Sequence, residues 1–300
     1  MVDSVTELGL PHLYSGKVRD LYSVGNDHLL LVASDRLSAF DVVMNESIPQ
    51  KGRVLTALTS YWLDELPDIP RALVSCDPAV IETYVPGFLQ ARHLHGRTML
   101  ARRAEMLPLE CIVRGRLAGQ AWDEYKEFGT VHHMESPGGM DLTDAFPRPI
   151  FTPSTKAETG HDLNISVAQA EELVGHDTVR AAAALCLALF NRAAEKLAIA
   201  NIVLADTKFE LGYVDGNLVV CDEVITPDSS RMWPADQVTS GQTPPSFDKQ
   251  PFRDWLSSQN WDRTPPPPAV PNEIVETTST RYVAAYERVT GRSLHSWFGE

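Results

Sequence analysis

The stretch from Ala205 to Leu211 reads Ala-Asp-Thr-Lys-Phe-Glu-Leu and is the strongest local signal in the chain. Alternate side chains of a β-strand point to the same face of the sheet. We therefore expect Asp206, Lys208 and Glu210 on one face, with the threonine and the apolar residues on the other. Taken alone, this pattern is also typical of a solvated sheet face, so its interpretation depends on the neighbouring sequence.

A second strand is expected to return beside the first over Leu218 to Asp222, after a turn at residues 215–217. If the turn has three residues, Glu210 lies directly opposite Asp222, whereas a two-residue turn would break this register. Two facing carboxylates repel each other unless a cation or a proton lies between them. With Lys208 nearby, the economical interpretation is a magnesium site, because oxygen ligands suit a metal bound to nucleotide phosphates.

Two segments that contain arginine are candidates for anion binding. The loop from Asp222 to Arg231 combines carboxylates, hydroxyl groups and one arginine, which could make a bidentate contact to a phosphate. The segment Val113-Arg114-Gly115-Arg116 ends an apolar strand and precedes a helix, a position that suits a phosphate or carboxylate pocket. For both segments the alternative is an ordinary polar surface.

Three further segments give weaker signals. Ser15–Asp20 places a glycine beside Lys17, which could reach nucleotide phosphates, although the chain has neither a P-loop nor a dinucleotide-binding glycine motif. Ser34–Asp41 and Phe151–Asp162 each mix hydroxyl groups, a cation and carboxylates, as a site for a zwitterionic amino acid would. We do not assign His161 as a base, because a histidine in an exposed loop is more often incidental.

The remaining pattern predicts a mixed α and β chain. Strands are expected first, with a hairpin around residues 25–27, and residues 136–158 read as one long functional loop. Ser166 and Gln169 form a capping-box pair that begins a helix ended by Gly175. The other expected helices are residues 54–66, 118–128, 178–198 and 272–290.

Composition excludes several classes of protein. The 26 basic and 40 acidic residues give a net charge of -14, which argues against binding nucleic acid or acidic membranes. The four cysteines are scattered and predict reduced, buried thiols. No signal peptide and no apolar run long enough to cross a bilayer is found, so a soluble, cytoplasmic protein is expected, either a monomer or a homodimer.

In their order along the chain, these segments closely resemble the SAICAR synthetase family of purine biosynthesis. The resemblance covers nearly the whole sequence and is most specific at Phe151–Asp162 and Asp222–Pro234. The other matching segments are Gly16–Asp20, Ser34–Asp41, Ile48–Gly52, Val113–Arg116, Ala205–Gly212, Asp248–Gln250 and Arg281–Gly291.

The resemblance implies an ATP-dependent ligase that joins carboxyaminoimidazole ribonucleotide to L-aspartate through an acyl phosphate, giving SAICAR, ADP and phosphate. It also implies an α+β, two-lobed fold similar to ATP-grasp enzymes. A β-rich lobe over residues 1–106 and a larger α/β lobe over residues 107–300 would hold ATP between them. A small-molecule kinase of related fold is the alternative, and a non-catalytic nucleotide-binding protein is a third possibility.

The resemblance also implies roles for individual residues. Glu210 and Asp222 would bind magnesium, and Lys208 and Asp206 would be catalytic. ATP would contact Gly16, Lys17, Arg103, Met106 and Lys208, and the other substrates would contact Ser38, Asp41, Glu110, Arg114, Gln120, Lys156 and Arg231. Gln120 departs from the family pattern, since many members carry serine there as a contact to the substrate phosphate. The cofactors implied are ATP and Mg2+.

Overall fold

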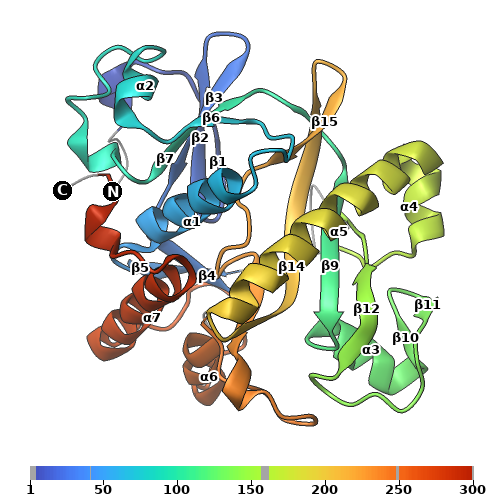
Figure 1. The fold of residues 1–300 in the computed structure, drawn as a ribbon. Helices are drawn as coiled ribbons and strands as arrows, with labels where there is room; N and C mark the ends of the chain where they lie inside the picture. Colours follow the sequence, from blue (N-terminus) through green and yellow to red (C-terminus); the bar gives the residue numbers. More distant parts are fainter. Residues whose placement is uncertain (1–4, 41, 157–161, 248–249, 299–300) are drawn as a thin grey trace.

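The computed structural model describes residues 5–40, 42–156, 162–247 and 250–298. Its two principal sheets and the helices that cover them form a two-lobed α+β fold (Figure 1). In the described residues, no helix is both long enough and apolar enough to cross a membrane.

The first sheet has the strand order β1-β2-β3-β7-β6. Its strands are β1 (His12–Ser15), β2 (Arg19–Val24), β3 (His28–Ala33), β6 (Leu73–Ser75) and β7 (Thr98–Arg102). The hairpin predicted around residues 25–27 is confirmed, because β2 and β3 pair from Val24 opposite His28 onward. One apolar cluster joins Leu30 and Leu100 of this sheet to Ile81 of α2 (Pro78–Glu82) and to Phe88 beyond it.

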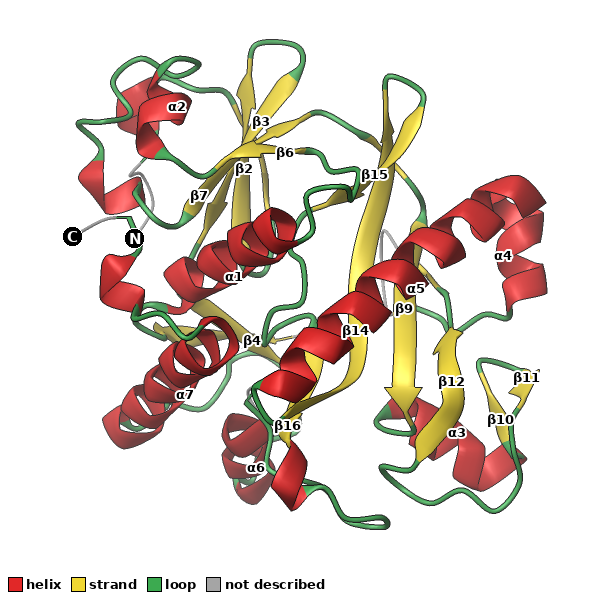
Figure 2. Cartoon of the chain, in the orientation of Figure 1, coloured by secondary structure: helices red, strands yellow, loops and turns green. Residues whose placement is uncertain are grey.

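The second sheet has β14 (Ile202–Val214) at its centre. This strand pairs with β9 (Leu109–Arg116), β15 (Asn217–Cys221), β16 (Ser230–Pro234) and the short β8 (Glu105–Met106). Helix α5 (His176–Ile199) crosses one face of this sheet (Figure 2). Its buried residues recur every three or four positions and pack against Phe209 and Leu211, so the sheet's opposite face remains for polar side chains.

The C-terminal helices pack on residues from the N-terminal part of the chain. α7 (Asn272–Thr290) contacts α1 (Lys51–Glu65), and its Tyr282 joins an apolar cluster with Leu55 and Leu58. Helix α6 (Gln250–Ser258), which we did not predict, adds Phe252 to the same cluster. The long-range contacts thus tie the two ends of the described chain together.

The predicted helices are confirmed to within a few residues, but the predicted loop over residues 136–158 is wrong in part. That segment contains β12 (Ala145–Phe151) and β13 (Ser154–Thr155), which both pair with β9. β12 includes two prolines and lies at the edge of the sheet, where a missing N–H donor is tolerated. The remaining α-helices and strands of the described residues are α3 (Gln120–Phe128), α4 (Val167–Val174), β4 (Arg36–Ala39), β5 (Val42–Ser47), β10 (Thr130–Val131) and β11 (Met134–Glu135).

Candidate active site

The pairing of three strands forms the basic end of the candidate site. Asp206 of β14 lies opposite Arg114 of β9 on one side and opposite Arg231 of β16 on the other. Its Oδ2 accepts a hydrogen bond from Arg114 Nη1 at 3.1 Å and from Arg231 Nη1 at 2.5 Å. Asp206 and Arg114 are both buried. Two arginines therefore share one buried carboxylate, which brings both guanidinium groups to the same place.

A cavity of about 240 Å³ opens onto this group. Gln120, the first residue of α3, lines it together with Lys208 and Ser229. Gly119, just before α3, has a φ of +58°, and a Cβ there would lie 2.3 Å from Arg231 Nη2. Glycine therefore lets the guanidinium group of Arg231 lie against the backbone.

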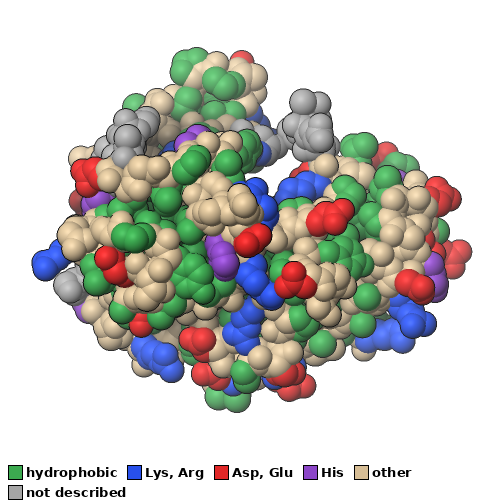
Figure 3. All heavy atoms as spheres, turned by 90° about the horizontal axis from the view of Figure 1, so that it is seen from above, with side chains coloured by type: hydrophobic (Ala, Val, Ile, Leu, Met, Phe, Trp, Pro, Cys, Tyr) green, Lys and Arg blue, Asp and Glu red, His purple; other side chains and the backbone are tan. Residues whose placement is uncertain are grey.

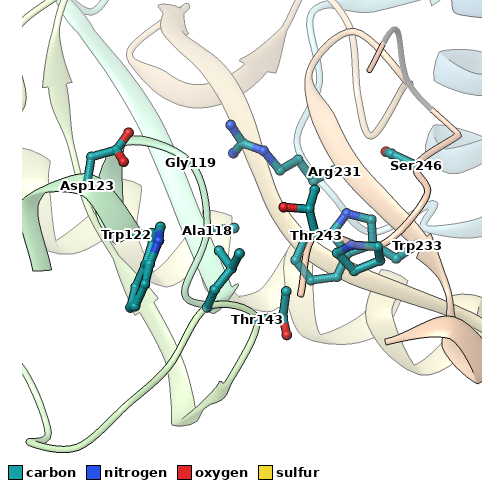
Figure 4. Close-up of a pocket in the computed structure, with 11 residues that line it drawn as sticks. Ala118, Gly119, Trp122, Asp123, Thr143, Arg231, Trp233, Thr243 and Ser246 are labelled. Carbon is teal, nitrogen blue, oxygen red and sulfur yellow. The ribbon is translucent and has the colours of Figure 1, made fainter. Parts of the chain in front are cut away.

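A second cavity, of about 320 Å³, adjoins the same arginine. Figure 4 shows Trp122 and Trp233 on opposite sides of it, with Arg231 at its edge. Thr143 and Ser246 are among the other polar residues of its lining. Arg231 therefore lies between two hollows.

Lys208 occupies the middle of the same face of β14. Its Nζ lies 2.5 Å from Glu110 Oε1, and Glu110 is itself buried on β9. Burial lowers the pKa of Lys208, but the negative charges of Glu110 and Glu210 more than compensate, so the net shift is upward. Lys208 is therefore a protonated cation at neutral pH. The predicted alternation is confirmed, because Phe209 lies in the core.

Carboxylates dominate the other end of β14. Glu210 Oε2 accepts a hydrogen bond from Lys156 at 2.6 Å. Asp222 Oδ2 accepts one from Arg19 Nη1 at 2.9 Å, and Arg19 Nη2 lies 3.1 Å from Glu223 Oε2. Arg19 belongs to β2, so this ion pair joins the first sheet to the end of β15.

The predicted pairing of Glu210 with Asp222 is wrong by one residue. Val214 pairs with Asn217, and Glu210 lies opposite Cys221. The turn has two residues because Asp-Gly readily adopts the left-handed angles of a type I′ turn, and both turn residues have positive φ. Asp222 comes directly after β15 and has a φ of +52°. Its side chain therefore does not follow the alternation of side chains along that strand.

Glu210 and Asp222 nevertheless influence each other. Burial raises the pKa of Asp222 to about 6, the charge of Arg19 opposes the shift, and the charges of Glu210 and Glu223 add to it. Asp222 Oδ1 is buried and has no hydrogen-bond partner within the described ranges. An oxygen of this kind beside a second carboxylate suits a hard cation. No cluster of three or more possible metal ligands occurs among the described residues.

The turn between β1 and β2 carries Gly16 and Lys17 toward the same region. Arg36 holds it, donating to Gly16 O at 3.1 Å and to Lys17 O at 3.4 Å, while its guanidinium group binds both oxygens of Asp20. A Cβ on Gly16 would lie 3.2 Å from Arg19 O, so the turn is narrow at this point. Lys17 itself is exposed.

The other predicted site residues are distributed as follows. The Arg103 side chain donates to Asn26 O and Ser23 Oγ, and Met106 is exposed on β8. Ser38 lies half-buried on β4. Asp41 and His161 lie outside the described residues.

Several buried polar residues of the site were missed by our sequence reasoning. Lys51 donates to Asp228 at 2.7 Å, and the hydroxyl group of Tyr282 donates to the same carboxylate, so α1 and α7 both hold the loop before β16. His132 contacts Arg114. Lys51 lies in the segment Ile48–Gly52 that resembles the family, which could have indicated it, but no local signal singles out His132.

Seen from above, Lys and Arg side chains gather in the hollow between the lobes (Figure 3). This concentration contrasts with the net charge of -14 of the whole chain. The cleft therefore provides local positive charge for anionic ligands on an acidic protein.

Comparisons with known proteins agree with one another. The family model described as SAICAR synthetase matches residues 12–268. A phosphoribosylaminoimidazole-succinocarboxamide synthase of Syntrophotalea carbinolica is 48% identical, over 97% of this chain and 99% of that protein. A solved structure described as SAICAR-synthase from Saccharomyces cerevisiae complexed with SAICAR is 41% identical with a TM-score of 0.88, and covers 98% of this chain and 97% of that one. Another, described as a SAICAR synthetase in complex with ADP, has a TM-score of 0.67 over 93% of this chain and 98% of that one; at 24% identity it supports the fold alone.

Proposed function

The chain belongs to the SAICAR synthetase family, and from this premise we propose how its cleft performs the reaction of that family. The protein is an ATP-dependent ligase that condenses carboxyaminoimidazole ribonucleotide with L-aspartate, giving SAICAR, ADP and phosphate. The observation that carries the proposal is the single face of β14 that holds Asp206, Lys208 and Glu210. Arg114 and Arg231 lie at its Asp206 end, and Asp222 lies near its Glu210 end.

The chemistry requires activation of a carboxylate. At neutral pH a carboxylate is a poor electrophile, because its charge repels nucleophiles and oxide is a very poor leaving group. Transfer of the γ-phosphoryl group of ATP to one carboxylate oxygen forms an acyl phosphate and releases ADP. The amine of aspartate then attacks the carbonyl carbon, loses a proton and displaces inorganic phosphate. The protein contributes mainly position and charge neutralisation.

The ribonucleotide is proposed to bind at the basic end. Arg114 and Arg231 would bind its phosphate in the cavity that Gln120 lines, because both guanidinium groups line that cavity and arginine can contact an oxyanion at two points. The Oδ2 atom of Asp206 accepts from both guanidinium groups, which favours a role in positioning them over direct contact with the amine. Glu110 would contribute to substrate binding indirectly, because its ion pair with Lys208 fixes the position of that lysine.

ATP is proposed to lie between the lobes. Lys17 and Lys208 would neutralise its phosphates, and the narrow turn at Gly16 would let the backbone approach them. Adenine would lie against the segment from Arg103 to Met106. The Arg103 side chain holds the β2–β3 turn, so this residue would contribute through its backbone.

The carboxylates at the other end fit a magnesium ion. Glu210 and the partnerless Oδ1 of Asp222 supply oxygen donors, and Mg2+ is commonly held by one or two carboxylates together with substrate phosphates. When bound, the ion would neutralise charge on the transferring phosphoryl group. Lys156 holds Glu210 in place, and the ion would replace it as the partner of Glu210.

The finer assignments belong to the same proposal. Ser38, Asp41 and Lys156 would bind the reacting carboxylate groups and the aspartate. Residues 1–106 and 107–300 would form the two lobes, and the protein would work in the cytoplasm as a monomer or homodimer.

The test is to incubate the protein with ATP, Mg2+ and the ribonucleotide, with and without L-aspartate, and to measure ADP and products. A ligase gives sustained ADP release and SAICAR when aspartate is present, and no such turnover with other amino acids. A stable phosphorylated product formed at full rate without any amine would instead identify a small-molecule kinase.

A further inference from the structure

His132 lies in a strained turn beside the substrate pocket. It and His133 link β10 to β11, and both have positive φ, +50° and +59°. Such angles are costly for residues other than glycine, and they persist where surrounding contacts hold them. Here Glu124 of α3 accepts hydrogen bonds from the backbone N–H groups of both histidines, at 2.9 and 2.8 Å, and from the Thr130 hydroxyl group.

The contacts of the His132 ring determine where its proton lies. Nδ1 lies 2.8 Å from Pro153 O, which can only accept, so Nδ1 carries the hydrogen. Nε2 lies 3.2 Å from Arg114 Nη2, which can only donate, so Nε2 is an acceptor. The ring is fully buried, and burial together with the charge of Arg114 lowers its pKa to about 4. The imidazole is therefore a neutral acceptor at neutral pH.

Arg114 gains its orientation from three directions. Nε donates to Thr152 Oγ1 at 3.1 Å, Nη1 to Asp206 and Nη2 to His132. Arginine has five N–H groups, and these contacts with described residues use three of them. One N–H group on Nη1 and one on Nη2 are not used by these contacts. These are the nitrogens that arginine uses to bind an oxyanion at two points.

We propose that His132 is a positioning residue whose imidazole holds the Arg114 guanidinium group ready for the phosphate of the ribonucleotide, an inference that rests on the proposed function. A neutral acceptor suits this task better than a carboxylate would. Asp206 already pairs with both arginines, and a second carboxylate at this position would add negative charge where the phosphate is proposed to bind.

The experiment compares side chains of matched length. His132→Gln keeps an acceptor oxygen at about the reach of Nε2, whereas His132→Met has a similar length without a comparable acceptor. His132→Asn is a second variant that lacks the acceptor at this reach, and asparagine tolerates positive φ well. The Michaelis constants for the ribonucleotide, ATP and aspartate are measured separately for each variant.

We expect His132→Met and His132→Asn to raise KM for the ribonucleotide about tenfold, on the scale of a lost hydrogen bond to a charged group. KM for ATP should change less than twofold, and His132→Gln should stay within about threefold of the parent. An unchanged ribonucleotide KM in the foldable acceptor-free variants, or an equal rise in KM for ATP, would overturn the inference.

Arg114→Lys separates this inference from the proposed function. Lysine cannot make the same planar contacts, so we expect this variant to raise KM for the ribonucleotide. In the Arg114→Lys background, adding His132→Asn should change this KM very little, because the contact it would disrupt is already lost. If Arg114→Lys raises KM but His132→Asn does so equally in both backgrounds, the positioning role fails while the phosphate role of Arg114 stands. If Arg114→Lys leaves KM unchanged, both fail.

Discussion

At one end of the cleft two arginines, Arg114 and Arg231, share the single carboxylate of Asp206. At the other end Glu210, Asp222 and Glu223 are balanced by Arg19 and Lys156. One end thus places two arginines around one carboxylate and the other gathers three carboxylates, although one strand supplies residues to both. An anion suits the first end and a divalent cation the second.

The difference shows how a single strand can supply residues to two binding sites of opposite character. Residues two apart on β14 share a face and are separated by about 7 Å along the strand. Lys208 lies between the two ends and is held by Glu110. The reacting carboxylate would therefore meet the γ-phosphoryl group near this lysine. Each prediction below tests whether the two ends are as distinct as their charges indicate.

The largest effect is expected at the acidic end. Glu210→Ala or Asp222→Ala should lower kcat about a hundredfold or more, on the scale of lost electrostatic stabilisers, and should raise the Mg2+ concentration needed for half-maximal rate. Steady-state ADP release across a Mg2+ titration measures both, and chelation of divalent cations should abolish turnover of the parent. Glu172→Ala, at an exposed position on α4, is the matched control. Near-normal turnover in both site variants would remove the metal assignment.

At the basic end, the expected change is in substrate binding. Arg231→Ala should raise KM for the ribonucleotide roughly ten- to a hundredfold, as expected for loss of a contact to a charged group. KM for ATP should stay within about twofold, because the variant leaves Lys17, Lys208 and both acidic residues in place. Each constant is measured by titrating one substrate while the other two are held at saturating concentrations. Equal changes in the two constants would mean that the ends do not act separately.

The buried histidine of the basic end predicts a pH dependence of stability. The folded pKa of His132, about 4, lies below the ordinary 6.5, so the unfolded chain binds more protons between these values. The free energy of unfolding should therefore fall as pH decreases through this window, by about 2 kcal/mol between pH 7 and pH 5. The charged and titratable groups that act on the ring are Arg114, Glu124 and His133.

Urea unfolding of the parent and of His132→Asn at pH 7 and pH 5 measures this contribution. The variant should lose about 2 kcal/mol less than the parent over the same interval, because its amide does not titrate. An identical loss in both proteins would show that His132 is not the buried neutral group described above.

The smallest effect is expected at Gln120. Gln120→Ser introduces the residue that many family members carry, and Gln120 is exposed at the rim of the pocket. Either side chain can donate one hydrogen bond, so kcat and the ribonucleotide KM should both stay within about threefold. A larger rise in KM would show that the longer amide makes a contact that serine cannot reach.

Local patterns predicted much of this structure. The alternation in Ala205–Leu211 placed Asp206, Lys208 and Glu210 on one face, and the capping box at Ser166 and Gln169 is present as expected. The last long helix has its predicted bounds, residues 272–290. These features depend on neighbours only a few residues apart, which a sequence shows directly.

The parts that sequence reasoning missed depend on distant residues. Arg114 and Asp206 meet because two strands 92 residues apart pair in one register, and no local rule fixes that register. Asp222 was misplaced by one residue because the Asp-Gly turn is shorter than expected. His132 reaches Arg114 through a turn held by Glu124, which only the folded chain reveals.

The central claim, that both ends of the cleft serve one activation of a carboxylate, is tested most directly with isotopic oxygen. The ribonucleotide is prepared with ¹⁸O in both oxygens of its carboxylate and is turned over with ATP and L-aspartate. The acyl phosphate route predicts one ¹⁸O in each released inorganic phosphate and one in the new amide. Phosphate released without ¹⁸O would contradict the account.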